Sequence, residues 1–147
     1  MTIRKLDHCS IRTPDLAASL RFYVDILGLR EGHRPPFDFP GAWLYRDGDQ
    51  ADYGVVHLIG IDRDHPEGLA AYLGDKPEAQ LHGSGAIDHL AFLASGLAGI
   101  RARLRGAGLP FTERTVPAMG LHQLFVADPS GLTIELNYEA AEAVEPR

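Results

Sequence analysis

The chain lacks the sequence features that are typical of secreted and membrane-embedded proteins. Of its 147 residues only Cys9 is a cysteine, so no disulfide can form within one chain, and a reducing compartment is the plain expectation. No apolar run approaches the roughly 20 residues of a membrane-spanning helix. The opening residues MTIRKLDHCS also lack the apolar core of a signal peptide. These absences predict a cytoplasmic protein that does not enter a membrane.

Basic residues are scarce relative to acidic ones. The chain has 14 lysines and arginines against 20 aspartates and glutamates, which gives a net charge of −6, and its basic residues form no block. Such a composition argues against nucleic acid and other polyanions as partners. A hydrophobic content of 45% is ordinary for a globular protein, and the length suits a single domain over residues 1–147.

What the chain does have is an internal repeat. The segments LDHCSI at residues 6–11 and IDHLAF at 87–92 both place an Asp-His pair in an apolar, alternating run, which predicts a buried strand. A helical pattern follows each segment, with Thr13 as the expected cap of the first helix and Ser95 as that of the second. Further strands are predicted in GAWLYRDGD, YGVVHLIGI, LHQLFVAD and LTIELNY. Each half therefore contains a strand, a helix and two or three more strands.

The repeat predicts the α+β class and a division into two modules. The first module spans residues 3–60, the second spans 86–138, and the glycine-rich segment 61–85 connects them. The tail 139–147 is rich in alanine and glutamate and is predicted to fray. Each module can bury its apolar faces by joining its sheet to that of its twin, with the helices outside. We expect an open, barrel-like cleft between the two sheets, where small ligands usually bind.

Four polar side chains stand out because the repeat places them inside apolar runs. His8 and His89 are equivalent, 89 − 8 = 81 residues apart, and His57 and Glu135 are equivalent, 135 − 57 = 78 residues apart. Their apolar neighbours point to the opposite face of a pleated strand, so all four are expected to project into the cleft. A lone histidine of this kind is usually a core or edge residue. A carboxylate flanked by isoleucine and leucine, however, is costly to bury without a cation or a proton.

These four side chains together predict a divalent metal site. Two or three imidazoles with one carboxylate suit Fe(II), Mn(II), Zn(II), Ni(II) or Co(II). If only His8, His89 and Glu135 bind the ion, the set is the two-histidine-one-carboxylate arrangement of Fe(II) oxygenases, and His57 serves as a nearby acid or base. If His57 binds as well, the ion acts as a Lewis acid on a substrate carbonyl, and Glu135 is the expected base.

Two segments, LDHCSIRTPDLAASLRFYVDILGLR and FVADPSGLTIEL, carry a likeness to a known family. They resemble the opening strand and helix and the closing hairpin of the vicinal oxygen chelate superfamily, which includes glyoxalase I, bleomycin-resistance proteins, methylmalonyl-CoA epimerase, fosfomycin-resistance enzymes and type I extradiol dioxygenases. The resemblance implies two tandem βαβββ modules, with metal ligands at His8, His89 and Glu135. His57 falls where glyoxalase I has a ligating glutamate and where extradiol dioxygenases have a catalytic, non-ligating histidine.

Aromatic side chains offer a wall for a substrate. Residues 34–47, RPPFDFPGAWLYRD, form a proline-rich stretch that either lines an apolar pocket or covers a sheet edge or a dimer partner. We also assign substrate contacts to His122, which could reach the mouth of the cleft, and to Phe125, which stands where the resemblance places a tyrosine in extradiol enzymes. The predicted contacts within the stretch are Phe37, Phe39, Trp43 and Tyr45.

Three functions follow from these patterns and from the resemblance. The first is an Fe(II) dioxygenase that acts on a small oxygenated substrate, aromatic or not, chelated through two oxygens. The second is a lyase or isomerase of the glyoxalase or epimerase kind, in which the metal is a Lewis acid and no oxygen is consumed. The third is a binding protein for a drug-like molecule, similar to the bleomycin-resistance proteins. By analogy with the family we expect a homodimer.

Overall fold

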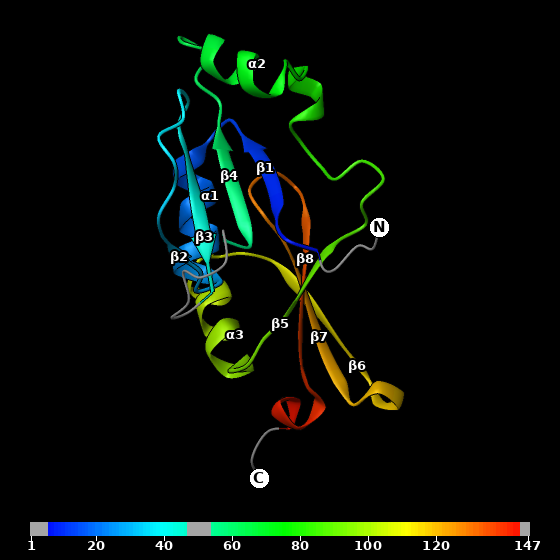
Figure 1. Cartoon of the computed structure of the whole chain (residues 1–147). Coiled ribbons are helices and arrows are strands. Elements are labelled where there is room, and N and C mark those ends of the chain that lie inside the picture. The colour runs from blue at the N-terminus through cyan, green and yellow to red at the C-terminus, as the bar shows by residue number, and fades with distance from the viewer. Residues whose placement is uncertain (1–5, 47–53, 145–147) are drawn as a thin grey trace, which may run out of the picture. The chain divides into compact units, whose positions relative to one another are not determined.

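A computed structural model describes residues 6–46 and 54–144 of the chain. The chain forms two compact units, Met1–Leu81 and His82–Arg147, called unit 1 and unit 2 below. Each unit carries one four-stranded sheet (Figure 1). Within the described ranges, no helix is long and apolar enough to cross a membrane.

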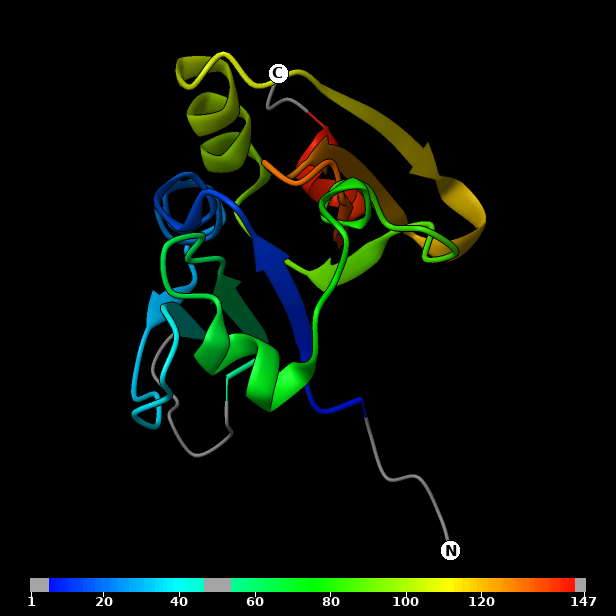
Figure 2. The ribbon, with the colours of Figure 1, turned by 90° about the horizontal axis from the view of Figure 1, so that it is seen from above.

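Unit 1 contains the first strand–helix–strands module and the segment that follows it. Its sheet has the order β1-β4-β3-β2, with β1 parallel to β4 and the other pairs antiparallel. The helix after β1, which is seen end-on in Figure 2, begins as an α-helix and continues as a π-helix. The elements in chain order are β1 (Cys9–Thr13), α1 (Leu16–Leu20), the π-helix (Arg21–Ile26), β2 (Arg30–Glu31), β3 (Gly41–Tyr45), β4 (Val56–Gly60), α2 (Glu67–Leu73) and a 3₁₀ turn (Glu78–Gln80).

Unit 2 repeats the same order of elements. Its sheet is β5-β8-β7-β6, with β5 parallel to β8, as β1 is to β4 in unit 1. Both modules are therefore βαβββ units, and the α+β class with two tandem modules is confirmed. The elements are β5 (Leu90–Leu93), α3 (Leu97–Gly106), β6 (Phe111–Val116), a 3₁₀ turn (Pro117–Met119), β7 (Leu121–Ala127), β8 (Thr133–Glu139) and a final 3₁₀ turn (Ala140–Ala143).

Each sheet buries the apolar face that alternation predicts. In unit 1 the fully buried side chains include Tyr23 of the helix and Leu44 and Val56 of the strands. In unit 2 Leu104 of α3 and Ile134 of β8 are equally inaccessible. Removing such side chains from water is the main favourable term in forming each module. The opposite face of each sheet is left for polar and aromatic side chains.

The register of the strands establishes the internal repeat residue by residue. Ser10 pairs with His57, and Ala91 pairs with Glu135. Ser10 and Ala91 each lie two residues after the histidine of an Asp-His pair. The predicted equivalence of His57 and Glu135 is therefore correct. In the next strands Trp43 pairs with His57 and Phe125 pairs with Glu135, which makes these two aromatic residues equivalent as well.

The helix starts differ from the expectation. Thr13 ends β1 rather than capping α1, and the side chain of Asp15 accepts from the N–H of Ala18 instead. Ser95 does not cap α3 either, because Gly96 occupies the cap position with a φ of +81° that a side chain would strain. The carboxylate of Glu142 accepts from the N–H groups of Gly96 and Leu97 at 2.7 and 2.9 Å.

Residues 139–143 form more regular structure than predicted. The tail from residue 139 was expected to fray, but β8 continues to Glu139 and a 3₁₀ turn follows over Ala140–Ala143. This turn holds Glu142 against the start of α3, which explains its order. Residues 3–5 of the first predicted module, residues 47–49 of the predicted strand GAWLYRDGD, and residues 145–147 of the tail lie outside the described part of the chain.

Candidate functional site

The repeated histidines occupy the position just before a strand begins in both units. His8 precedes β1, and His89 precedes β5. In each case Nδ1 lies within hydrogen-bonding distance of the preceding aspartate, at 2.8 Å from Asp7 Oδ2 and 2.7 Å from Asp88 Oδ1. Because an ionised carboxylate can only accept, Nδ1 must carry the proton, and Nε2 is the nitrogen left for a ligand. This arrangement of carboxylate and imidazole is typical of metal-binding histidines.

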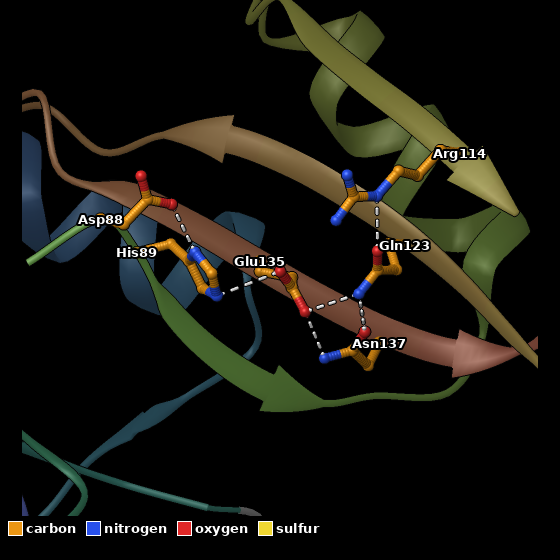
Figure 3. A network of polar contacts seen from close by, with 6 residues as sticks. All are labelled: Asp88, His89, Arg114, Gln123, Glu135 and Asn137. Carbon is orange, nitrogen blue, oxygen red and sulfur yellow. Dashed lines mark hydrogen bonds and ion pairs between the residues drawn. The ribbon is translucent and has the colours of Figure 1, made fainter. Parts of the chain in front are cut away.

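Glu135 lies on the same face of unit 2 as His89 and is held by two amides. It is 5% exposed. Its Oε1 accepts from Gln123 Nε2 at 2.8 Å and from Asn137 Nδ2 at 2.7 Å, while Oε2 lies 3.2 Å from His89 Nε2 (Figure 3). The two oxygens of one carboxylate therefore have separate roles, one anchored and one directed at the histidine.

A chain of further contacts orients the amide of Gln123. Its Oε1 accepts from Arg114 Nε at 2.6 Å, and its Nε2 also donates to Asn137 Oδ1 at 3.0 Å. The guanidinium can only donate, so it determines which end of the amide faces Glu135 (Figure 3). Neither Gln123 nor Asn137 was predicted to belong to the site. Each nevertheless lies two positions from a predicted residue, Phe125 or Glu135, and therefore on the same face of its strand.

The facing atoms of His89 and Glu135 suit a divalent cation. With its proton on Nδ1, a neutral imidazole presents a lone pair to the carboxylate, so a proton or a cation is needed between the two acceptors. Two donors bound at roughly 2.1 Å and at right angles to each other are about 3.0 Å apart, close to the observed 3.2 Å. This donor pair therefore fits a metal ion.

His57 is fixed by aromatic stacking. It is buried at 7% exposure, and its ring lies 4.1 Å from that of Trp43 and 3.9 Å from that of His8, with interplanar angles of 6° and 17°. The three rings form a continuous stack on one face of unit 1. Of the four predicted donors, each unit thus brings two together, His8 with His57 and His89 with Glu135.

No set of three or more His, Cys, Asp or Glu side chains within the described residues is arranged to hold a metal ion.

A pocket of about 360 Å³ opens beside the stack in unit 1. We call it the aromatic pocket. Its polar lining comes from Asp7, His8, Ser10, Arg34 and His57. Phe37, Phe39 and Trp43 line it, in agreement with the sequence, and Tyr72 and Leu73 of α2 join them. Leu58 and Ile59 complete the lining.

Tyr45 and Tyr72 differ from the expectation in opposite ways. Tyr45 does not line the aromatic pocket, because its hydroxyl donates to the carbonyl of His33 at 2.7 Å and its ring fills the space beside Gly32. Tyr72 lies in α2, within the segment 61–85 that connects the two modules, and its ring centroid is 5.1 Å from that of Phe37. Nothing in the local pattern marks it as a pocket residue.

A second, shallower hollow of about 310 Å³ lies in unit 2 beside His89. Phe125 lines it, with its ring edge-on to His89 at 6.4 Å and the guanidinium of Arg114 over its face at 5.0 Å. Phe125 is therefore next to a predicted metal ligand, as a substrate contact should be.

His122, by contrast, lies on the opposite face of β7. Its ring contacts Thr115 Oγ1 at 2.9 Å and Glu113 Oε2 at 3.3 Å, and Glu113 forms a bidentate pair with Arg101 of α3. The hydrogen bonds from Arg101 hold the pKa of Glu113 below its usual range. Because Gln123 faces Glu135, its neighbour His122 must face away. The structure therefore places His122 in a buried polar cluster and not beside the predicted donors.

The family of the chain is identified by comparison with known proteins. The model of the glyoxalase/bleomycin resistance protein/dioxygenase superfamily matches residues 5–136. The chain belongs to this superfamily. Its two βαβββ modules and the likeness noted in the sequence agree with this assignment.

Curated relatives in the superfamily carry glyoxalase names. A protein of Arabidopsis thaliana named glyoxylase I 4 is 26% identical over 91% of this chain and 70% of its own length. A lactoylglutathione lyase of Haemophilus influenzae is 28% identical, with 87% of each chain covered. A second lactoylglutathione lyase, from Schizosaccharomyces pombe, is 27% identical over 92% of this chain, and the match covers 48% of that relative's own length.

Solved structures of the superfamily share the fold. A glyoxylase/bleomycin resistance protein/dioxygenase domain from Frankia sp. EAN1pec superposes with a TM-score of 0.64 at 24% identity, covering 94% of this chain and 93% of that one. TnmS3, an antibiotic binding protein from Streptomyces sp. CB03234, has a TM-score of 0.61 at 18% identity, covering 95% and 98%. Enzymes and binding proteins thus use this architecture, so function must be argued from the side chains.

Proposed function

We propose that the chain is a divalent-metal-dependent lyase or isomerase of the glyoxalase kind, which acts on a small oxygenated molecule without consuming oxygen. The observation that carries this proposal is the pair of facing acceptors, His89 Nε2 and Glu135 Oε2 at 3.2 Å, in which the remaining imidazole nitrogen and carboxylate oxygen are both anchored. The glyoxalase names of the curated relatives support the type of reaction.

The proposed ligands are the four side chains that the sequence singles out. They are His8 and His57, which lie together within unit 1, and His89 and Glu135, which face each other within unit 2. A bound divalent ion would polarise a carbonyl oxygen of the substrate and so make a neighbouring C–H bond more acidic. His57 departs from the ligating glutamate expected of glyoxalase I, and it serves either as a ligand or as an acid or base beside the substrate.

Proton transfer is assigned to Glu135. Its Oε1 is held by Gln123 and Asn137, so Oε2 is the oxygen that, on leaving the metal ion, would accept a proton from carbon and return it to the neighbouring carbon. Phe125, which lines the hollow beside His89, would contact a part of the substrate that does not react.

The Fe(II) dioxygenase expected from His57 finds no support in these relatives, whose names are those of glyoxalases and lyases. The two reactions differ in their use of oxygen and in their tolerance of other metals. Oxygen consumption requires a redox-active ion, whereas Lewis-acid chemistry proceeds with Zn(II), Ni(II) or Co(II).

The metal site is tested by calorimetric titration of the full chain with Zn(II), Ni(II) and Co(II) after treatment with a chelator. We expect one ion per chain and a large loss of affinity in His89→Ala and Glu135→Gln. His65→Ala is the matched control, since His65 is an exposed loop residue at 78% side-chain exposure. Equal affinity in all four proteins would refute the metal site.

The type of reaction is tested by deuterium exchange under argon. The metal-loaded protein is mixed with lactoylglutathione and a panel of α-hydroxycarbonyl compounds in D₂O, and proton NMR follows the C–H next to the carbonyl. We expect exchange or isomerisation of at least one compound with Ni(II), Co(II) or Zn(II), and none with Glu135→Gln. Turnover that requires both Fe(II) and oxygen would instead establish the dioxygenase.

A further inference from the structure

We infer that the aromatic pocket of unit 1 binds a small planar aromatic carboxylate, with the ring against the aromatic walls and the carboxylate on Arg34. As a statement about the substrate, this inference rests on the proposed function. The binding itself can be measured without a metal ion, so the two proposals can fail separately.

The walls of the aromatic pocket are built to contact a flat apolar group. The ring centroids of Phe37 and Phe39 are 5.2 Å apart with an interplanar angle of 18°, and both lie within 5.6 Å of the ring of Tyr72. The ring of Trp43 lies 6.1 Å from that of Phe37 and continues into the stack with His57. Aromatic side chains attract another ring in offset-stacked or edge-on arrangements.

Arg34 supplies the only cationic guanidinium or ammonium group among the described lining residues of this pocket. Its Cζ lies 4.9 Å from the ring centroid of Phe37 and 5.1 Å from that of Phe39, and its Nη2 donates to the carbonyl of Phe39 at 2.8 Å. These contacts hold the side chain in place before a ligand arrives, which lowers the entropic cost of binding.

The charge of Arg34 has no counter-ion among the described residues. Burial lowers the pKa of its guanidinium, although the group stays charged at neutral pH. A cation next to apolar walls is poorly solvated and gains from an anion that replaces the lost water. The planar fork of a guanidinium matches the two oxygens of a carboxylate.

The size of the aromatic pocket limits the ligand. Its volume of about 360 Å³ is near the lower end of the roughly 300–1,000 Å³ found for small-molecule sites. One or two fused rings with a short acidic group are therefore the class of ligand that fits.

Binding is measured on the full chain after chelator treatment, with 4-nitrobenzoate as the probe. Trp43 is the only tryptophan of the chain, so quenching of its fluorescence by the nitroarene reports on this pocket, and calorimetry gives the affinity. We expect 4-nitrobenzoate to bind at least tenfold more tightly than the neutral 4-nitrobenzyl alcohol, and acetate not to bind in the same range.

Two variants separate the roles of charge and ring. Arg34→Gln is expected to weaken 4-nitrobenzoate at least tenfold and to leave the alcohol unchanged. Tyr72→Ala, which removes a side chain that is 60% exposed and so should not affect folding, is expected to weaken the acid and the alcohol alike. Arg105→Gln is the matched control, because Arg105 also lies over a phenylalanine ring, at 5.8 Å from Phe111, but outside the pocket.

Several results would overturn the inference. One is equal affinity for 4-nitrobenzoate and 4-nitrobenzyl alcohol. Another is an Arg34→Gln protein that binds 4-nitrobenzoate as tightly as the unchanged chain. A third is the absence of any quenching of Trp43 fluorescence. Binding of the acid only when metal is present would also overturn it, since the metal and not Arg34 would then hold the carboxylate. Glu135→Gln, which should abolish metal binding, is expected to retain 4-nitrobenzoate binding, and so it distinguishes failure of this inference from failure of the proposed function.

Discussion

At the scale of single residues, the two Asp-His pairs are the most informative feature of the chain. Each aspartate is largely exposed, with side-chain exposures of 52% for Asp7 and 95% for Asp88, so neither contributes much to stability as an ion pair. Each nevertheless fixes the tautomer and the direction of a ring whose Nε2 is a predicted metal ligand. Their purpose is therefore to orient rather than to stabilise.

Replacing one of these aspartates should weaken metal binding and leave stability unchanged. Asp88→Ala is expected to lower Zn(II) affinity by roughly 10–100-fold, the usual effect of removing the partner of a metal-binding histidine. Calorimetric titration measures the affinity, and Asp25→Ala, which also removes an exposed aspartate, is the control. Unchanged affinity in Asp88→Ala would show that His89 needs no such partner.

Gln123 should matter for stability as well as for the site. Gln123→Ala leaves the buried carboxylate of Glu135 with one amide donor in place of two and removes the acceptor of Arg114. We expect a loss of about 1–3 kcal/mol in the free energy of unfolding, measured by urea denaturation. Gln80→Ala, in an exposed 3₁₀ turn, should change it by less than about 0.5 kcal/mol. Equal effects of the two substitutions would contradict the anchoring role of Gln123.

At the scale of secondary-structure elements, ionic contacts join α3 to the strand and the turn beside it. Arg101 of α3 binds Glu113 of β6 through two hydrogen bonds of 2.8 Å, and Glu142 accepts from the first N–H groups of the same helix. These contacts are partly shielded from water, so they should be worth more than ordinary surface pairs.

The pair of Arg101 and Glu113 should make stability depend on pH. The folded pKa of Glu113 is lowered, chiefly by its hydrogen bonds with Arg101, so the pair stabilises the fold above the unfolded pKa of a glutamate, and this contribution is lost as the pH falls through the folded pKa. Arg101→Met should cost about 1 kcal/mol at neutral pH, and less as the pH is lowered below about 4.3. Urea denaturation over a pH series measures this, with Arg105→Met as the control. A cost that does not change with pH would contradict it.

Glu142 should stabilise α3 from a distance of 46 residues along the chain. Glu142→Ala removes the acceptor of two N–H groups at the start of the helix, and we expect a loss of about 1 kcal/mol in the free energy of unfolding. Glu139→Ala, an exposed glutamate at the end of β8, is the matched control. A loss no greater than in the control would mean that water replaces the cap without cost.

At the scale of the whole molecule, the homodimer expected from the sequence stays a prediction. Both sheets are open, so each has two edge strands with hydrogen-bonding groups on one side. Covering such edges symmetrically is a common reason for dimers. Size-exclusion chromatography with light scattering is expected to give twice the mass of one chain. A single-chain mass that persists at high protein concentration would contradict the dimer.

The sequence was sufficient for features that depend on period and repetition. Alternation and the recurrence of the Asp-His pair predicted the two modules and the equivalence of His57 with Glu135, because a repeated fold must repeat its strand register. Alternation alone also shows that His122 and Phe125, an odd number of positions apart on one strand, cannot share a face. That rule was available before the structure and would have removed His122 from the predicted contacts.

Only the tertiary structure decided how certain polar side chains meet. The hydrogen bond from Gln123 of β7 to Glu135 of β8 and the cap that Glu142 provides to α3 join residues of different elements. The position of Arg34 over two phenylalanine rings depends on the course of a loop that has no regular pattern. A sequence pattern reports which face of an element is buried. The direction of a polar atom depends on donors and acceptors that folding brings from elsewhere, and the chemistry of this protein follows from those directions.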